Sequence, residues 1–303
     1  MTQTPKKSSP SPATKASGRP AGLFTWLTVG IVVAVVGVLV IVKVSSGNGT
    51  QADTEWTPAD ASVIRDLTTV PQSVFDAVGV NSPVVNVTPP QIHASEPKLT
   101  FNNSSTVGVL YYGAEYCPYC AAQRWPVIVA LSRFGTWANL GNSSSSAQDY
   151  FPNTPTFTFY KATYQSEWVT LQTVEEAKNT LNAAGTSYEP LQKPTALQTQ
   201  IVTKYDNATY FPSMSAGQSG SIPFFTIGNR VMWAGSSLSP SVFKDQARGD
   251  IAVSLKNPNN PLTQAIIASA NYITAGICSQ TNNAPAAVCD TPGVKAATTA
   301  LGL

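Results

Sequence analysis

Cys117 and Cys120 lie between the apolar run of residues 107–112 and a segment, residues 120–135, with apolar side chains at helical spacing. A buried strand that leads at once into a helix starts an α/β arrangement, so this junction constrains the fold more than any other feature. Free backbone N–H groups and the helix dipole at the start of a helix stabilise a thiolate. We expect Cys117 to be the nucleophile of a redox pair and Cys120, one turn further on, to resolve its mixed disulfide.

The chain holds two more cysteines, Cys278 and Cys289, and a single histidine, His93. A structural disulfide, or half of a zinc site completed by these residues, is the alternative interpretation of the first pair. Zinc takes four ligands, often from a second closely spaced pair, whereas Cys278 and Cys289 are eleven residues apart. We expect no metal and no cofactor. A structural disulfide between Cys278 and Cys289 would add about 2–4 kcal/mol, with a second redox pair or free thiols as alternatives.

Ile222 and Pro223 come before a predicted hairpin, residues 222–233, whose strands are joined by a tight Gly228-Asn229 turn. A proline at the first position of a strand is tolerated, so its placement alone needs no function. If the Ile222–Pro223 bond is cis, the backbone of Ile222 turns toward the cysteines and can pair with an extended substrate chain. We predict the cis bond and assign Ile222 and Pro223 to substrate binding.

The segments YYGAEYCPYCAAQRW, ALSRFG, PNTPTFTFY and IPFFTIGNR resemble the thioredoxin superfamily, and within it an uncharacterised family of membrane-anchored thioredoxin-like proteins of archaea and actinobacteria. The resemblance runs from about Val70 to the C-terminus. It implies an α/β thioredoxin-like sandwich with nucleophile Cys117, resolving Cys120 and cis-proline Pro223, and C-P-Y-C is the arrangement of glutaredoxins. Thioredoxins keep a buried acid where this chain has Tyr111, which argues against a thioredoxin-like reductase.

Glu115 precedes Cys117 by two residues and is either a proton-transfer group or an ordinary surface charge. Pro126 should kink the helix after the cysteines or end its first part. The chain around 136–221 is longer than a minimal thioredoxin needs, so we expect an inserted element over the active-site face that selects substrates or partners. Periodicity predicts strands at 156–160 and 168–171 and helices at 70–79, 173–184, 195–205, 240–255 and 261–276.

Residues 21–42 form an uncharged run of 22 residues. At about 1.5 Å per residue, a helix of this length spans a hydrocarbon core of about 30 Å. Every charged residue before the run is basic, so the positive-inside rule places the N-terminus in the cytoplasm and the rest of the chain outside. A cleaved signal peptide is the competing interpretation, but its apolar region has only about 7–15 residues and ends at a small-residue cleavage site.

Composition and these patterns together divide the chain into five parts. Only 11% of the residues are charged, which disfavours a nucleic-acid binder. We expect a disordered cytoplasmic tail at 1–20, a transmembrane helix at 21–43, a linker at 44–60, a thioredoxin-like extracytoplasmic domain at 61–277, and a C-terminal extension with the disulfide at 278–303.

These features predict a single-pass protein of the cell membrane, an extracytoplasmic thiol–disulfide oxidoreductase that oxidises or isomerises exported proteins. Its expected partners are cysteine-containing exported proteins, a membrane or soluble redox partner, and the lipid bilayer around residues 21–43, with no nucleic acid. A disulfide reductase fed from the membrane leaves the same motif. A non-catalytic thioredoxin-like binding module of an envelope complex is the alternative from another class of protein.

Overall fold

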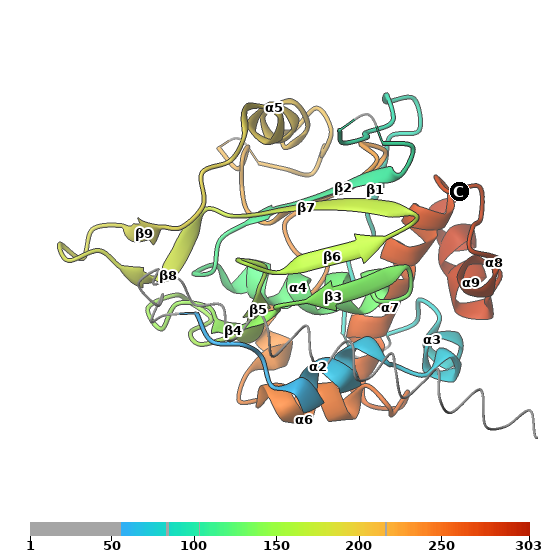
Figure 1. Cartoon of the computed structure of the whole chain (residues 1–303), viewed down its shortest axis with the longest axis horizontal. Helices are drawn as coiled ribbons and strands as arrows, with labels where there is room; N and C mark the ends of the chain where they lie inside the picture. The colour runs from blue at the N-terminus through green and yellow to red at the C-terminus, as the bar shows by residue number, and fades with distance from the viewer. Residues whose placement is uncertain (1–55, 83–84, 103, 216) are drawn as a thin grey trace, which may run out of the picture. The chain divides into compact units, whose positions relative to one another are not determined.

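A mixed sheet of five strands forms the centre of the protein within residues 56–82, 85–102, 104–215 and 217–303, which the computed structural model describes (Figure 1). Its strands are β1 (Gln91–Ile92), β2 (Val107–Gly113), β7 (Val169–Glu175), β10 (Phe224–Ile227) and β11 (Val231–Ala234). They lie in the order β1-β11-β10-β2-β7. Only β2 and β7 are parallel among these neighbours; the other pairs are antiparallel. The predicted mixed α/β class is confirmed.

Each face of this sheet has its own apolar core, because neighbouring side chains of a strand point to opposite faces. Tyr111 of β2 belongs to the larger core, which also contains side chains of α4 (Pro118–Leu131) and α7 (Pro261–Cys278). The adjacent Leu110 belongs to the smaller core, together with side chains of α5 (Ala196–Tyr205). Figure 1 shows α5 on one side of the sheet and α4 and α7 on the other.

Helix α4 starts directly after Cys117, with Pro118 in its first turn, where a missing N–H costs nothing. Within the helix only Tyr119 is exposed, so the expected amphipathic pattern is wrong: α4 is buried on all sides. The reason is that α7 and α2 (Ala61–Thr68) pack against it, in addition to the core of the sheet. Of the two outcomes predicted for Pro126, a kink or an end of the helix, the end is wrong, since α4 continues through this residue to Leu131.

Small antiparallel ladders lie in the chain between α4 and β10, together with α5 and with β7 of the central sheet. This is the region, around 136–221, where an inserted element is expected from the sequence. The helix predicted at 173–184 is wrong: β7 and β8 occupy this segment, since pairing with β2 and burial of Glu175 outweigh the local helix preference. The ladders are β3 (Gly135–Ala138) with β6 (Thr163–Ser166), β4 (Gly141–Ser144) with β5 (Pro155–Thr158), and β8 (Ala177–Leu181) with β9 (Tyr188–Pro190).

Several predicted elements are confirmed, among them α5, whose first residue is fixed by a cap. The Thr195 hydroxyl accepts the Gln198 N–H, and the Gln198 side chain accepts the Thr195 N–H, which is a capping box. The predicted hairpin is β10 and β11, with Gly228 and Asn229 both at positive φ. The helix predicted at 240–255 is divided into two. These two are η1 (Pro240–Phe243) and α6 (Arg248–Ser254). The helices predicted at 70–79 and 261–276 are α3 (Gln72–Val78) and α7.

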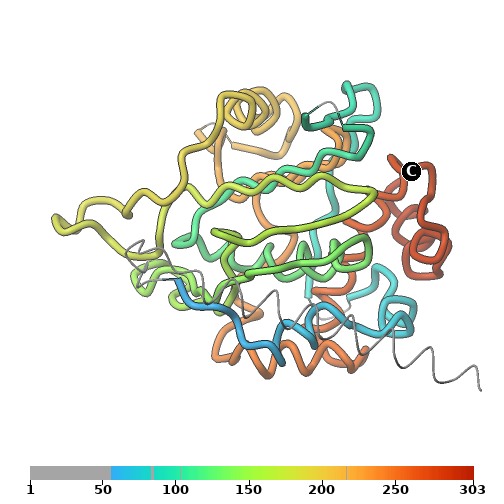
Figure 2. Tube along the Cα trace, in the orientation of Figure 1, coloured from blue at the N-terminus to red at the C-terminus, as the bar shows by residue number. Residues whose placement is uncertain are grey.

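Both ends of the described chain pack on the same domain. Residues 56–60, predicted as linker, already join it: the Ala59 N–H donates to the Leu140 carbonyl at 2.9 Å. The segment 278–303 is no separate extension either, because α9 (Pro292–Leu301) packs against α3 and α7 and buries Val294. Figure 2 shows α2, in blue, running beside α6, in orange, although they lie far apart in the sequence.

The N-terminal predictions fall on another part of the chain. The tail at 1–20, the transmembrane helix at 21–43 and all but the last residues of the linker at 44–60 lie outside the described residues. Among the residues from 56 onward that the structure describes, no helix is both long enough and apolar enough to span a bilayer.

Candidate active site

The cysteines of the C-P-Y-C motif lie at the junction of β2 and α4, as predicted. Cys117 immediately precedes the helix, and its Sγ accepts a hydrogen bond from the Cys120 backbone N–H at 3.2 Å. The thiol thus takes the place of the serine or aspartate side chain that often caps a helix. Cys117 is 5% exposed and Cys120 is fully buried, and both are free thiols. The more accessible sulfur is therefore the one at the helix start.

The surroundings of the two sulfurs drive their pKa values apart. A hydrogen bond with the Cys120 side chain lowers the pKa of Cys117 against the opposing effect of burial, and the Cys120 N–H and the charge of Arg124 lower it further. Burial raises the pKa of Cys120 well above its usual value, and its hydrogen bond with Cys117 adds to this. A Cys117 thiolate beside a protonated Cys120 is the arrangement that nucleophilic attack requires.

A buried ion pair lies one turn beyond Cys120. Arg124 of α4 donates from Nε to Glu175 Oε1 at 2.8 Å and from Nη2 to Oε2 at 2.5 Å, and both side chains are fully buried. Nη2 also donates to the Ala114 carbonyl at 2.8 Å, in the loop that leads to the cysteines. Such two-point pairing satisfies charges that would otherwise be costly to bury. It fixes a positive charge that acts on both sulfurs.

Tyr111 of β2 lies fully buried beside Cys120. Its hydroxyl donates to the Cys120 carbonyl at 3.3 Å, and its ring centre lies 5.7 Å from the Arg124 guanidinium carbon. Burial raises the pKa of Tyr111 well above its usual value. The tyrosine therefore stays protonated and supports the first turn of α4 instead of accepting a proton from Cys120.

Glu115 lies in the loop between β2 and α4 and is half-buried. Burial raises the pKa of its carboxyl, against the effect of a hydrogen bond with the Thr158 side chain. Its backbone N–H donates to the Ala177 carbonyl of β8 at 2.9 Å. These contacts tie Glu115 to the neighbouring ladders, and its carboxyl bonds to Thr158 rather than to a cysteine.

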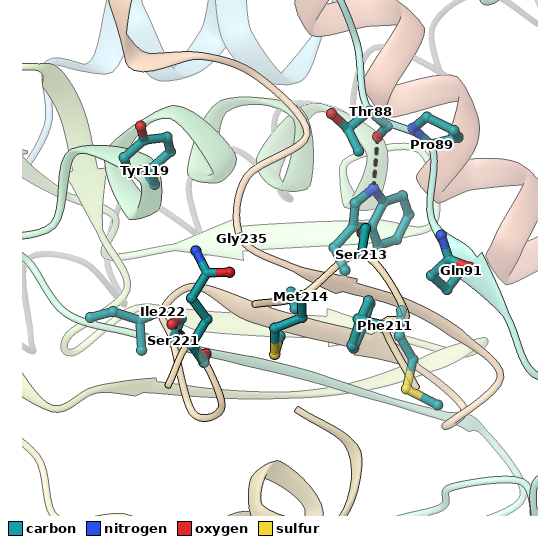
Figure 3. Close-up of a pocket in the computed structure, with 14 residues that line it drawn as sticks. Thr88, Pro89, Gln91, Tyr119, Phe211, Ser213, Met214, Ser221, Ile222 and Gly235 are labelled. Atoms are coloured by element: carbon teal, nitrogen blue, oxygen red, sulfur yellow. Dashed lines mark hydrogen bonds between the residues drawn. The ribbon is translucent and has the colours of Figure 1, made fainter. Parts of the chain in front are cut away.

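Ile222 lies beside Cys117, and the peptide bond between Ile222 and Pro223 is cis, as predicted. The Ile222 carbonyl oxygen lies 3.6 Å from Cys117 Sγ. Pro223 is buried directly before β10, whose Phe224 pairs with Tyr112 of β2. The β10–β2 ladder therefore holds the two segments together. A pocket of about 500 Å³ opens beside Ile222 (Figure 3).

Aromatic side chains surround the start of α4. The β8–β9 ladder lies against the cysteine loop, since the Tyr188 ring stacks on Tyr116 with centres 4.1 Å apart. Tyr119, between the two cysteines, is 45% exposed and meets Phe151 edge-on at 6.1 Å. β8 and β9, which follow β7 in the sequence, thus lie beside the cysteine loop.

The predicted disulfide between Cys278 and Cys289 is present, which rules these residues out as ligands of a shared zinc site. It lies near the C-terminal end of α4: Arg133 Nη2 is 3.5 Å from the Val288 carbonyl and 3.3 Å from the Thr291 hydroxyl. The free cysteines lie at the opposite end of this 14-residue helix, about 20 Å away at 1.5 Å per residue. Direct exchange between the two pairs is out of reach.

Sequence reasoning missed three parts of this site: the Arg124–Glu175 pair, the Tyr116–Tyr188 stack and the pocket beside Ile222. The first left a trace in the sequence, because Arg124 is the only charged residue within a helix of otherwise uncharged side chains. Its partner lies 51 residues later and nothing in the sequence marks it.

Comparison with known proteins gives one match. A family model described as a domain of unknown function (DUF929) covers residues 92–279, more than half of the chain. The matched region contains both free cysteines, the Arg124–Glu175 pair and Ile222–Pro223. No curated protein and no solved structure matches the chain.

Proposed function

The chain belongs to the family defined by the domain of unknown function DUF929, and we propose that it is a thiol–disulfide oxidoreductase with a thioredoxin-like fold. One observation carries the proposal: Cys117 Sγ accepts the Cys120 N–H at a helix start and lies 3.6 Å from the Ile222 carbonyl. In support of the fold, the parallel unit β2-α4-β7 is followed by the antiparallel β10 and β11 and by α7. This is the order that the resemblance to thioredoxins implies.

The exchange proceeds in two balanced steps. In the oxidising direction, a substrate thiolate attacks Cys117 of the oxidised pair; a bond forms between these sulfurs, and Cys120 leaves as a thiolate that takes a proton. A second substrate thiolate then attacks the substrate sulfur, which forms the substrate disulfide and releases the Cys117 thiolate. Two electrons pass from substrate to enzyme, and a disulfide-bearing membrane or soluble redox partner takes them up again. In the reverse direction, Cys117 attacks a substrate disulfide and Cys120 resolves the intermediate.

We place the domain outside the cytoplasm, anchored by residues 21–43. The buried disulfide between Cys278 and Cys289 supports this placement, because such bonds persist in oxidising compartments and are rare in the cytosol. Exported proteins with cysteines are then the substrates, and oxidation or isomerisation is the preferred direction. The helix start and the charge of Arg124 favour a Cys117 thiolate, and stabilisation of the reduced form makes a pair more oxidising.

The direction is tested by the redox potential of the Cys117–Cys120 pair, measured on the purified chain against glutathione buffers, together with oxidative refolding and insulin reduction. We expect a potential well above the cytosolic poise of about −220 to −320 mV, and faster refolding than reduction of insulin. A potential within the cytosolic range, with rapid reduction of insulin, would instead identify a reductase.

The activity itself is tested by Cys120→Ala in native membranes. Without its resolving thiol, Cys117 should accumulate mixed disulfides with exported proteins, visible on non-reducing gels and lost on reduction. The matched control is the double variant Cys117→Ala with Cys120→Ala, which should trap nothing. If Cys120→Ala traps nothing either, and the wild-type pair resists strong reductant, the chain is a binding module and not an enzyme.

A further inference from the structure

The pocket beside Ile222 is built from four separate parts of the chain, one of them Tyr119. Buried Met232 contributes from β11, Phe211 and Met214 from the chain between α5 and β10, and Gln91 from β1. Figure 3 shows Ile222, Met214 and Phe211 close to the β10–β11 ribbon and Gln91 at its other end. Its volume of about 500 Å³ falls within the range of ligand pockets, about 300–1,000 Å³.

The lining of this pocket is uncharged and combines apolar side chains with neutral polar ones. Among the residues the structure describes, those that line it include no acidic or basic side chain. The indole N–H of Trp233 already donates to the Thr88 carbonyl at 3.1 Å, the dashed line in Figure 3, so this residue offers mainly its ring. The thioethers of Met214 and Met232 adapt to apolar groups of different shape. A charged side chain would find no oppositely charged group in this lining, so its burial here is unfavourable.

The pocket lies beside the dithiol, although neither cysteine lines it. Ile222 lines it and also places its carbonyl 3.6 Å from Cys117 Sγ, and Tyr119, between the two cysteines, lines it as well. In an extended polypeptide, successive residues advance about 3.3 Å, and every second side chain points to the same side. When a substrate cysteine meets Cys117, a side chain one or two residues away therefore reaches the pocket.

We infer that this pocket binds an apolar side chain of a polypeptide, next to the cysteine that reacts with Cys117, and so selects cysteines with apolar neighbours. The inference rests on the proposed function and names the substrate class of the same site. A cysteine next to a buried apolar residue is exposed only in a chain that has not finished folding. The preferred substrate is accordingly an unfolded or partly folded polypeptide.

The test uses short peptides in which serine replaces the cysteine, so that binding is measured without redox chemistry. One series carries leucine or phenylalanine beside the serine, and the matched series carries aspartate or lysine at the same position. Calorimetry on the full chain should show at least about tenfold tighter binding of the apolar series, the discrimination that one buried apolar group provides. Equal affinities for both series would overturn the inference, whether or not the protein is an oxidoreductase.

A variant locates the binding. Met214 is half-buried and packs against the smaller core, whereas both cysteines belong to the larger core. Met214→Glu should therefore weaken the apolar peptides about tenfold or more, while Met214→Leu should bind them as the wild type does. Met214→Glu should also lower the exchange rate with apolar cysteine-containing peptides more than it lowers the rate with hydroxyethyl disulfide. Unchanged peptide binding by Met214→Glu would place the site elsewhere. If the wild-type chain binds the apolar series but exchanges neither with the cysteine-containing peptides nor with hydroxyethyl disulfide, the proposed function is refuted and the inference about the pocket stands.

Discussion

At the scale of single residues, the charge of Arg124 is the feature that most distinguishes this dithiol. Its guanidinium is fully buried, is held at two points by Glu175, and lowers the pKa of Cys117 together with the hydrogen bonds to that sulfur. Removing one member of a buried pair leaves the other unpaired and costs about 3–5 kcal/mol, so both must be replaced to isolate the electrostatic effect.

The double variant Arg124→Gln with Glu175→Gln keeps polar groups of similar size and removes both charges. The pKa of Cys117 should rise, because the positive charge that favours the thiolate is gone. The measurement is the ultraviolet absorbance of the thiolate during a pH titration. Glu175→Gln alone is the matched control: it leaves the positive charge in place, so the Cys117 pKa should not rise. A rise in both variants would show that geometry, and not charge, sets this pKa.

The sequence alone predicts the two cysteines, the cis bond at Pro223 and the disulfide, because each follows from a short pattern of neighbouring residues. It does not predict the Arg124–Glu175 pair, whose members come from α4 and β7 and meet only once these elements have packed. Tyr111 is a similar case. Its position in the strand is evident, but its bond to the Cys120 carbonyl depends on where α4 lies.

At the scale of elements, the chain between α5 and β10 closes on itself at Asp206. The Asp206 carbonyl accepts the Gly220 N–H at 3.1 Å, and the chain between these residues carries Phe211 and Met214 into the pocket. Both carboxyl oxygens of Asp206 are buried without a hydrogen-bond partner among the described residues. Burial raises the pKa of this carboxyl to about 7.

This carboxyl makes the stability of the segment depend on pH. In the folded protein its pKa lies above the ordinary value of 3.8. The contribution of the neutral carboxyl to the free energy of unfolding is therefore fully present below pH 3.8 and is lost as the pH rises through about 7. Asp206→Asn removes the ionisation. Its melting temperature relative to wild type should therefore rise between pH 5 and pH 8, by about 2–4 °C for each kcal/mol of relieved charge burial.

Scanning calorimetry of both proteins across this pH range gives the comparison. Asp250→Asn, at an exposed position in the first turn of α6, controls for the loss of one negative charge anywhere on the surface. If the two asparagine variants follow the same pH profile, burial of Asp206 has no special role.

The elements that were predictable from the sequence share strong local signals. Periodicity predicts α5, whose start the structure shows capped at Thr195, and the Gly228-Asn229 turn predicts the β10–β11 hairpin. The helix predicted at 173–184 fails because its glutamates and alanine favour a helix, whereas β7 is held by its neighbour β2 and by the ion pair of Glu175. The small ladders between α4 and β7 carry no clear alternation of apolar residues, so the sequence gives little sign of them.

At the scale of the whole molecule, the two sulfur pairs occupy opposite ends of α4. The free pair lies at its start, and the Cys278–Cys289 disulfide joins the end of α7 to α8 (Ala286–Cys289), beside α9. The disulfide thus fastens the C-terminal helices to the core, and the length of α4 separates it from the site of exchange.

Replacing both Cys278 and Cys289 with alanine should therefore lower stability and spare activity. We expect the free energy of unfolding in urea to fall by about 2–4 kcal/mol, as for removal of a short disulfide loop. The rate of exchange between Cys117 and a model disulfide should match that of wild type under conditions where both are folded. A large loss of exchange at unchanged stability would revive the alternative of an electron relay between the pairs.

The hydrogen bond from the Cys120 N–H to Cys117 Sγ has one more consequence. A thiolate is a strong acceptor and a disulfide sulfur a weak one, so α4 is well capped only while the protein holds two extra electrons. Reduction of the cysteine pair therefore stabilises the N-terminal end of α4, and oxidation weakens its capping. The oxidised and reduced proteins thus differ in the stability of the first turn of α4. A partner that binds this turn can distinguish the two forms without contacting either sulfur.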